Sequence, residues 1–211
     1  MWYKKQNKNY EVFHGTQDIN SILNSGFLYR FTGQGADEYG PGFYFTTSQE
    51  IAHAYSLESV NDSYNRRGIV RPGDKGTPGI IKAKVNLNKP IKINASNSNH
   101  SLFKSWPILN REQVKQMIEL SLKLEGDSVL ENWGDPASEK VVDIINKIVK
   151  NYINLPFSFL LYDFFKPNSF VEALRLITKM TGYDGVIIKS NNTKNFIVVA
   201  WYSEQIQIIK E

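Results

Sequence analysis

The chain has 211 residues and a formal net charge of +4. Of its residues 41% are hydrophobic, 13% aromatic and 22% charged. This composition is typical of a soluble globular protein and disfavours disorder, collagen and coiled coil. No stretch approaches the roughly 18 apolar residues of a transmembrane helix, and no apolar run follows the basic N-terminus as in a secretory signal, so we expect no membrane partner. There are no cysteines, which excludes disulfides, thiolate nucleophiles and Cys-ligated zinc and fits a reducing cytoplasm.

The first segment of the chain mixes short strands and helices around a glycine-rich loop. In chain order we expect a strand at 10–13, a helix at 18–24, a loop at 32–42, a strand at 43–46 and a helix from 49 to near Tyr55. Gly26 is suited to end the first helix, and Thr47 or Ser48 to cap the second. This segment therefore predicts alternating α and β structure.

The next segment is polar and rich in Gly, Asn, Asp and Arg. We expect a loop at 57–79, and a loop of this length in a compact domain is often functional. A strand is predicted at 80–85, where apolar residues alternate with Lys82 and Lys84, and a further short strand at 91–93.

Residues 107–182 have a helical pattern, and the tail returns to strands. Apolar residues at helical spacing predict helices at 111–125, 138–153 and 168–180, the last ended by Gly182. The predicted strands of the tail lie at 185–189, 196–201 and 205–209, with a hairpin turn at 191–194 between the first two. The expected fold is α+β: a single domain over 1–211 whose antiparallel-rich sheet is split by a helical insert at about 100–182.

Common catalytic motifs are absent from the sequence. There is no Walker loop, HExxH, GxSxG or EF-hand pattern, and the spacing of His14, His53 and His100 suggests no metal site. What remains is an ordered set of polar and aromatic residues. His14-Gly15-Thr16 follows a short strand, Tyr44 lies in the strand after the glycine-rich loop, and Tyr55 comes 11 residues later.

These residues resemble the ADP-ribosyltransferase superfamily, on its diphtheria-toxin/PARP-like side, which carries a His–Tyr–Glu triad. More closely, they are similar to transferase domains of phage and mobile-element polyvalent proteins. The matching motifs are Gly33-Gln34-Gly35, Tyr39-Gly40-Pro41-Gly42, Tyr44-Phe45, Ala52-His53-Ala54-Tyr55 and Tyr183-Asp184-Gly185-Val186-Ile187. The resemblance covers about residues 10–56 and 183–209, and its specificity lies in the order of the motifs.

The resemblance implies that NAD is the co-substrate and that no metal is needed. His14 would bond the adenosine-side ribose of NAD, Gly15 would offer backbone groups to the nicotinamide carboxamide, and Thr16 would bond the carboxamide or the nearby ribose. Tyr44 and Tyr55 would stack on the cationic nicotinamide ring. The loop at 32–42, including Gly35, would close over the dinucleotide.

The third position of the triad departs from the family. A Glu usually opens the strand that is predicted here at 196–201, where it bonds the nicotinamide-side ribose and steadies positive charge. One alignment of the strand places Asn195 at that position and another places Ile197, and neither residue is acidic. Glu204 is a substitute, although its position predicts a surface turn.

Two classes of function therefore remain open. The preferred interpretation is a mono-ADP-ribosyltransferase of phage, mobile-element or toxin type, which modifies a protein or a nucleic acid. An antitoxin or a phage or host protein would be its partner. The alternatives are a degenerate module that binds NAD or a partner without turnover, and an NAD glycohydrolase with water as the acceptor. The basic cluster at 66–75 fits either a solvated loop or a phosphate contact.

Overall fold

The structure is a computed structural model that describes residues 8–28, 40–66, 76–95, 106–190 and 194–210. The chain forms two compact units. The sheet unit comprises Met1–Thr32, Gly42–Asn94 and Asp184–Glu211, and the helical unit comprises Gly33–Pro41 and Ala95–Tyr183. The glycine-rich stretch up to residue 39 lies outside the described residues, so the predicted loop there is not described.

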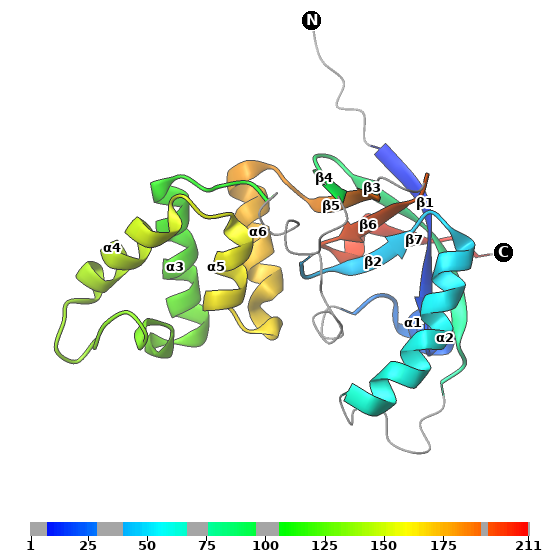
Figure 1. Cartoon of the computed structure of the whole chain (residues 1–211), viewed down its shortest axis with the longest axis horizontal. Helices are drawn as coiled ribbons and strands as arrows, with labels where there is room; N and C mark the ends of the chain where they lie inside the picture. Colours follow the sequence, from blue (N-terminus) through cyan, green and yellow to red (C-terminus); the bar gives the residue numbers. More distant parts are fainter. Residues whose placement is uncertain (1–7, 29–39, 67–75, 96–105, 191–193, 211) are drawn as a thin grey trace, which may run out of the picture. The chain divides into compact units, whose positions relative to one another are not determined.

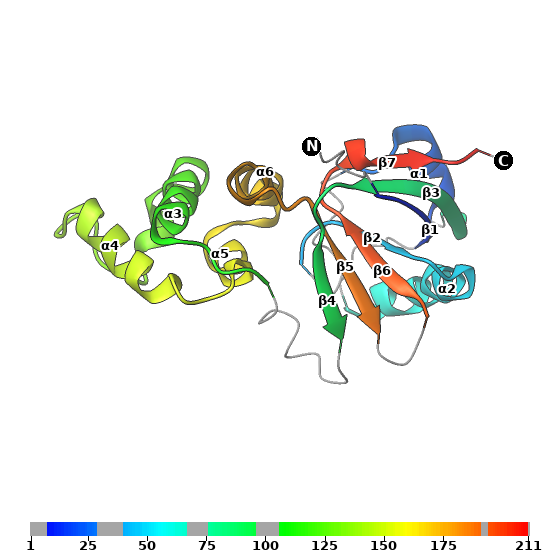
Figure 2. The same cartoon turned by 90° about the horizontal axis from the view of Figure 1, so that it is seen from above.

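In the described residues of the sheet unit the strands form a seven-stranded sheet, accompanied by two α-helices and a short 3-10 helix (Figure 1). Its elements in chain order are β1 (Lys8–Thr16), α1 (Ile19–Ser25), β2 (Phe43–Thr46), α2 (Gln49–Arg66), β3 (Gly79–Leu87), β4 (Ile91–Ala95), β5 (Gly185–Ser190), β6 (Phe196–Ala200) and β7 (Ile206–Ile208). The strand order is β4-β5-β6-β2-β1-β3-β7, part of which can be followed in Figure 2.

Most neighbouring strands run antiparallel. β1 pairs with β3 over its whole length, from Lys8 opposite Leu87 to Thr16 opposite Gly79. β6 pairs with both β2 and β5, so strands from before and after the helical segment join in one sheet. The predicted α+β class with a mostly antiparallel sheet is therefore confirmed, and the insert divides the sheet in sequence but not in space.

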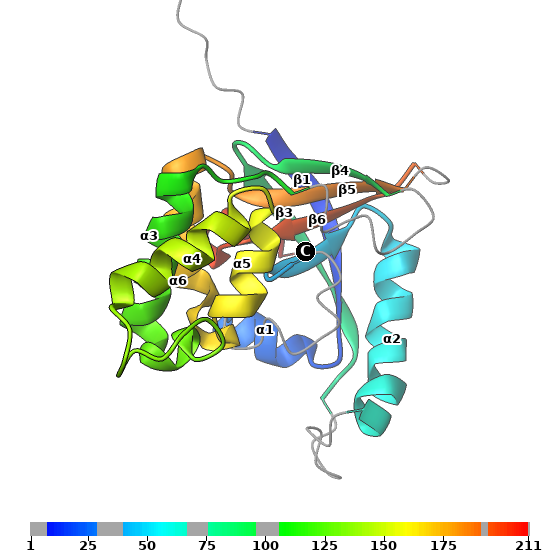
Figure 3. The same cartoon turned by 60° about the vertical axis from the view of Figure 1, so that its left-hand side comes forward.

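Alternation along the strands gives the sheet two different faces. One face carries an apolar core that includes Val12, Phe43, Phe45, Val85 and Val198. On the other side α2 packs against β1, β2 and β3 (Figure 3). The contacting side of α2 is made of small residues, since Ala52 and Ser56 are buried, which lets the helix approach the strands closely.

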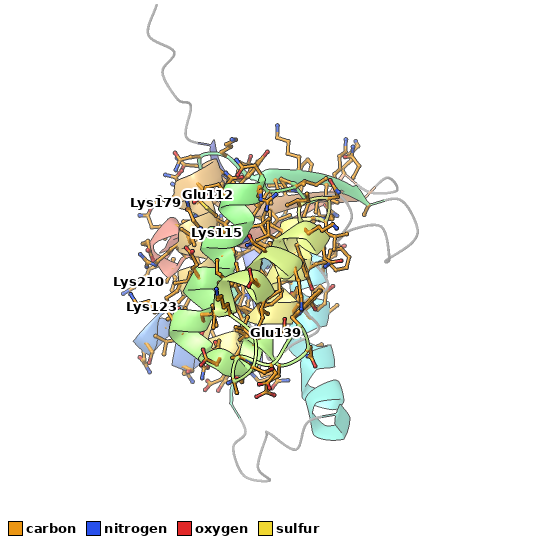
Figure 4. The ribbon with its side chains drawn as sticks, turned by 90° about the vertical axis from the view of Figure 1, so that its left-hand side faces the viewer. Glu112, Lys115, Lys123, Glu139, Lys179 and Lys210 are labelled. Carbon is orange, nitrogen blue, oxygen red and sulfur yellow. The ribbon has the colours of Figure 1, made fainter. Side chains whose placement is uncertain are left out.

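The helical unit is built from four amphipathic or buried helices. They are α3 (Arg111–Glu125), α4 (Val141–Tyr152), α5 (Phe157–Phe164) and α6 (Phe170–Thr181). α3 begins with a capping box between Asn110 and Gln113, and α6 ends at Gly182 in the left-handed conformation, as predicted. Charged side chains of both signs cover its outside, among them Lys115 and Lys123 of α3 (Figure 4).

Three predictions differ from the structure: β1 spans Lys8–Thr16 instead of 10–13, α2 ends later than predicted, and α5 was not predicted. α2 continues to Arg66 instead of ending near Tyr55, so residues 57–66 are helix and not part of a loop. The stretch is polar and rich in Ser, Asn and Asp, which is typical of a loop, but it contains no glycine or proline to end the helix. α5 was missed because five of its eight residues are buried and it shows little polar alternation. No helix in the described parts of the chain is both long and apolar enough to span a membrane.

Candidate functional site

His14 lies where strands β1 and β2 meet. The registered pair between these strands is Phe13 opposite Thr46, and one residue further the Nδ1 atom of His14 lies 2.7 Å from the carbonyl oxygen of Tyr44. The imidazole thus supplies a link between the two strands next to their backbone pairing. Its ring packs edge-on against Phe27, with 5.1 Å between centroids, and tilted against Phe45 at 5.5 Å.

This environment fixes the chemical state of His14. A carbonyl oxygen only accepts hydrogen bonds, so Nδ1 carries the hydrogen and donates it to Tyr44. Burial lowers the pKa of His14 below its ordinary value, against the opposing effect of the bond to Tyr44. At neutral pH the ring is therefore uncharged, and its Nε2 atom is a hydrogen-bond acceptor.

Gly15 lies directly beneath helix α2. A Cβ atom at this position would overlap the carbonyl oxygen of Ala52 and would lie 2.8 Å from the backbone nitrogen of Ser56. Both atoms belong to backbone that cannot swing away, so only glycine allows this approach. The structural requirement for Gly15 therefore exists without any ligand.

The two candidate stacking residues lie on the elements next to Gly15. Tyr44 is partly buried in β2 between Phe43 and Phe45, whose side chains belong to the core, so alternation turns Tyr44 toward the other face of the sheet. Tyr55 lies on α2, three residues after Ala52, and is 55% exposed. The structure joins His14 to the backbone of Tyr44 and not to its ring: the imidazole packs on Phe27 and Phe45 of the core face, and the Tyr44 side chain lies on the opposite face.

Asn195 lies immediately before β6, beside the start of α2. The backbone N–H of Thr47 donates to the carbonyl of Phe196 at 3.1 Å, and the N–H of Phe196 donates to the Thr47 hydroxyl at 2.9 Å. These two bonds hold Asn195 next to the first turn of α2. It lines an open pocket of about 710 Å³ together with Ser48, Gln49, Glu50, His53 and Ile80.

The structure gives the two candidate positions for the third triad residue different surroundings. Ile197 is paired with Thr46 on one side and with Ile188 on the other, inside the sheet, whereas Asn195 lines the pocket. Glu204 lies in the 3-10 turn Ser203–Gln205, where the Ser203 hydroxyl donates to its carboxylate, and it does not line this pocket.

Thr16 and Gly35 are the two remaining residues that were predicted to contact NAD. The Thr16 hydroxyl accepts a hydrogen bond from the N–H of Asp18 at 3.2 Å and so shapes the entry to α1. Gly35 lies outside the described residues.

The Asp184-Gly185 motif has a structural role. The buried carboxylate of Asp184 accepts the N–H of Asn88 at 2.7 Å and that of Lys89 at 2.9 Å, so it holds the turn between β3 and β4. A Cβ at Gly185 would lie 2.7 Å from the carbonyl oxygen of Val199. Because both acceptor oxygens of Asp184 are engaged with backbone, this motif organises the sheet.

Sequence reasoning missed the polar residues at the start of α2. Glu50 and His53 lie one turn apart and both are exposed, so a helix beginning at Gln49 presents them together. The spacing of Glu50 and His53 in the predicted helix already indicated that they share one face. That Asn195 lies beside them follows only from the hydrogen bonds between Thr47 and Phe196.

The charge of the chain is concentrated in the sheet unit. That unit contains 15 Lys and Arg against 9 Asp and Glu, a net charge of +6, whereas the helical unit contains 10 against 12, a net charge of −2. A net positive field favours an anionic ligand such as a dinucleotide or a nucleic acid. The candidate residues thus lie in the basic part of the chain.

The described side chains offer hydrogen-bond acceptors, a tight glycine and aromatic rings, and among them no group of three or more His, Asp or Glu residues is placed to hold a metal ion. Comparison of the chain with models of protein families and with curated proteins gives no match.

Proposed function

We propose that the protein is an NAD-dependent mono-ADP-ribosyltransferase that acts on a macromolecular acceptor, either a protein or a nucleic acid. One observation carries the proposal: the hydrogen bond between His14 Nδ1 and the Tyr44 carbonyl joins two of the motifs that are far apart in sequence. A third motif begins at Asn195, directly before β6. Strand β2 lies between β6 and β1 in the sheet. The ordered motifs of the sequence thus occupy three neighbouring strands.

The chemistry of these groups suits NAD. The unprotonated Nε2 of His14 accepts a hydrogen bond from a ribose hydroxyl. The aromatic rings of Tyr44 and Tyr55 suit a flat cationic nicotinamide. The net charge of +6 on the sheet unit favours the two negative charges of the pyrophosphate.

In the proposed reaction the bond between the ribose C1″ and the nicotinamide nitrogen breaks. Its electron pair leaves with nicotinamide, which becomes neutral, and positive charge develops on the ribose. A nucleophile of the acceptor forms the new bond to C1″ and loses its proton. Such a reaction depends mainly on positioning and on electrostatic stabilisation of the developing charge. We expect one ADP-ribose unit per site, because elongation would normally use an acidic residue at position 195.

The second candidate function is binding of NAD without turnover. It is favoured by one observation: the residue that lines the pocket at the start of β6 is the neutral Asn195. An NAD glycohydrolase differs from the transferase only in using water as the acceptor, so the products of the reaction distinguish the two.

The experiment incubates the purified protein with adenylate-labelled NAD and a bacterial lysate, and separates the products into protein, DNA and RNA. We expect label in one macromolecular fraction, and we expect His14→Ala and Tyr44→Ala each to lower labelling by about 100-fold or more. Tyr162→Ala, at an exposed tyrosine of the helical unit, is the matched control and keeps wild-type labelling.

Each other outcome selects an alternative. Free ADP-ribose without labelled macromolecules indicates the glycohydrolase. Intact NAD, with binding measured by calorimetry and lost in His14→Ala, indicates the binding module. Wild-type labelling in both His14→Ala and Tyr44→Ala contradicts the assignment of the site.

A further inference from the structure

Glu50 lies in the same pocket as Asn195, and strand pairing brings it there. Thr47 and Phe196 are hydrogen-bonded to each other, so Ser48 and Asn195 lie side by side at the ends of β2 and β6. Ser48 then caps α2, since its hydroxyl accepts the N–H of Ile51 at 3.3 Å. Glu50 follows in the first turn of this helix and lines the pocket with Asn195 and His53.

The proposed reaction needs a negative charge near the ribose. Departure of nicotinamide leaves positive charge on C1″ and the ring oxygen, and a fixed carboxylate nearby stabilises that charge far better than a neutral amide does. The Asn195 side chain can hydrogen-bond a ribose hydroxyl but carries no charge. The carboxylate must therefore come from another part of the chain.

The other described acidic side chains of the sheet unit are held elsewhere. Glu11 pairs with Lys82 at 2.8 Å, and Asp18 caps α1 by accepting the N–H of Ser21. Asp184 is bound to the turn between β3 and β4, and Glu204 lies in the turn after β6. Of the acidic side chains that the structure describes in this unit, Glu50 is the one that lines the pocket.

We propose that Glu50 supplies the carboxylate that faces the ribosyl cation, while Asn195 hydrogen-bonds the same ribose. The charge and the hydrogen bond thus come from two elements, the first turn of α2 and the start of β6. The inference rests on the proposed function, because it assigns a role in the cleavage of NAD.

The test compares Glu50→Gln with the matched control Glu204→Gln in the full chain. For each variant, NAD consumption gives kcat and KM, and calorimetry gives the Kd of NAD. We expect Glu50→Gln to lower kcat by about 100-fold while the Kd of NAD changes by less than about 3-fold. Glu204→Gln keeps both values. Thermal unfolding confirms that each variant is folded.

A second variant moves the charge to β6. In the double variant Glu50→Gln with Asn195→Glu, a carboxylate returns to the pocket from the neighbouring element, and we expect kcat to recover to within about 10-fold of wild type. A merely structural role of Glu50 predicts no such recovery. If Glu50→Gln loses activity only because the protein is unstable, the double variant stays inactive, and this result contradicts the proposed role of Glu50.

The outcomes separate the inference from the proposed function. Wild-type kcat in Glu50→Gln, together with loss of activity in His14→Ala, overturns the role of Glu50 and leaves the transferase standing. An equal loss in Glu50→Gln and Glu204→Gln also overturns it, since the effect then follows net charge. A wild-type protein that consumes no NAD overturns both.

Discussion

The two units of the molecule differ in what they bury. The helical unit has a core of apolar side chains, and the buried polar side chains that the structure describes in it are Ser121 and Ser158. The Ser121 hydroxyl donates to the Phe164 carbonyl at 2.5 Å. The sheet unit holds a partly buried imidazole and a buried carboxylate, each bound to backbone: His14 at Tyr44, and Asp184 at Asn88 and Lys89. Buried polar groups cost stability unless they are fully paired, so the sheet unit carries constraints that packing alone does not demand.

This difference agrees with the placement of the proposed site in the sheet unit. In the helical unit each helix buries apolar side chains, and α3 also has a capping box. In the sheet unit, a glycine touches a helix backbone and a histidine links two strands. Residues that break local sequence–structure rules in this way are expected at functional sites, where selection acts on activity as well as on stability.

The largest effect is expected in the helical unit. Phe157 is fully buried and packs edge-on against Trp106 at 4.8 Å between centroids. Phe157→Ala leaves a cavity and should lower the free energy of unfolding of this unit by about 4 kcal/mol. Hydrogen exchange of the α3–α6 peptides measures this loss.

Phe159→Ala is the control for this prediction, because Phe159 is 38% exposed on the same helix. It should cost clearly less than Phe157→Ala. Equal losses of protection in the two variants would contradict the placement of Phe157 in the core.

The second prediction tests the close approach at Gly15. Gly15→Ala forces the new Cβ into the backbone of α2 and should destabilise the sheet unit by about 3 kcal/mol, with loss of NAD binding. Gly126→Ala meets no atom within 4 Å, but its φ of +80° and ψ of −173° lie in a region that is essentially limited to glycine, so it should cost about 1–3 kcal/mol while NAD binding is kept. Chemical denaturation of both variants measures the difference. A Gly15→Ala protein as stable as wild type would show that α2 lies elsewhere.

The smallest effect is the pH dependence that His14 produces. Because its folded-state pKa is lowered, the unfolded chain binds a proton first as the pH falls below about 6.5. Stability should therefore be complete above this pH and decline below it, by at most about 1.4 kcal/mol per pH unit. The folded-state pKa marks the lower end of this decline.

Urea unfolding between pH 7.5 and 5 measures this dependence. His14→Gln removes the titrating group and should flatten the decline. Identical pH dependence in wild type and His14→Gln would show that the imidazole is not enclosed as described.

Much of the fold followed from patterns that are local in sequence. The helix at Arg111–Glu125 and the strand at Phe43–Thr46 have the predicted bounds, because a capping residue and clear periodicity mark them. The end of α2 did not, since nothing local distinguishes a polar helix from a polar loop. α5 was missed because a helix buried on most sides lacks the amphipathic signal.

The α+β class, most elements and the candidate residues His14, Gly15, Tyr44, Tyr55 and Asn195 could be predicted from the amino-acid sequence. Their positions relative to one another follow from the three-dimensional fold. Strand pairing bound the His14 ring to the Tyr44 carbonyl and set Asn195 beside Glu50, which is about 145 residues away along the chain. Contacts between distant segments depend on sheet register and helix packing, and neither is encoded in a local pattern.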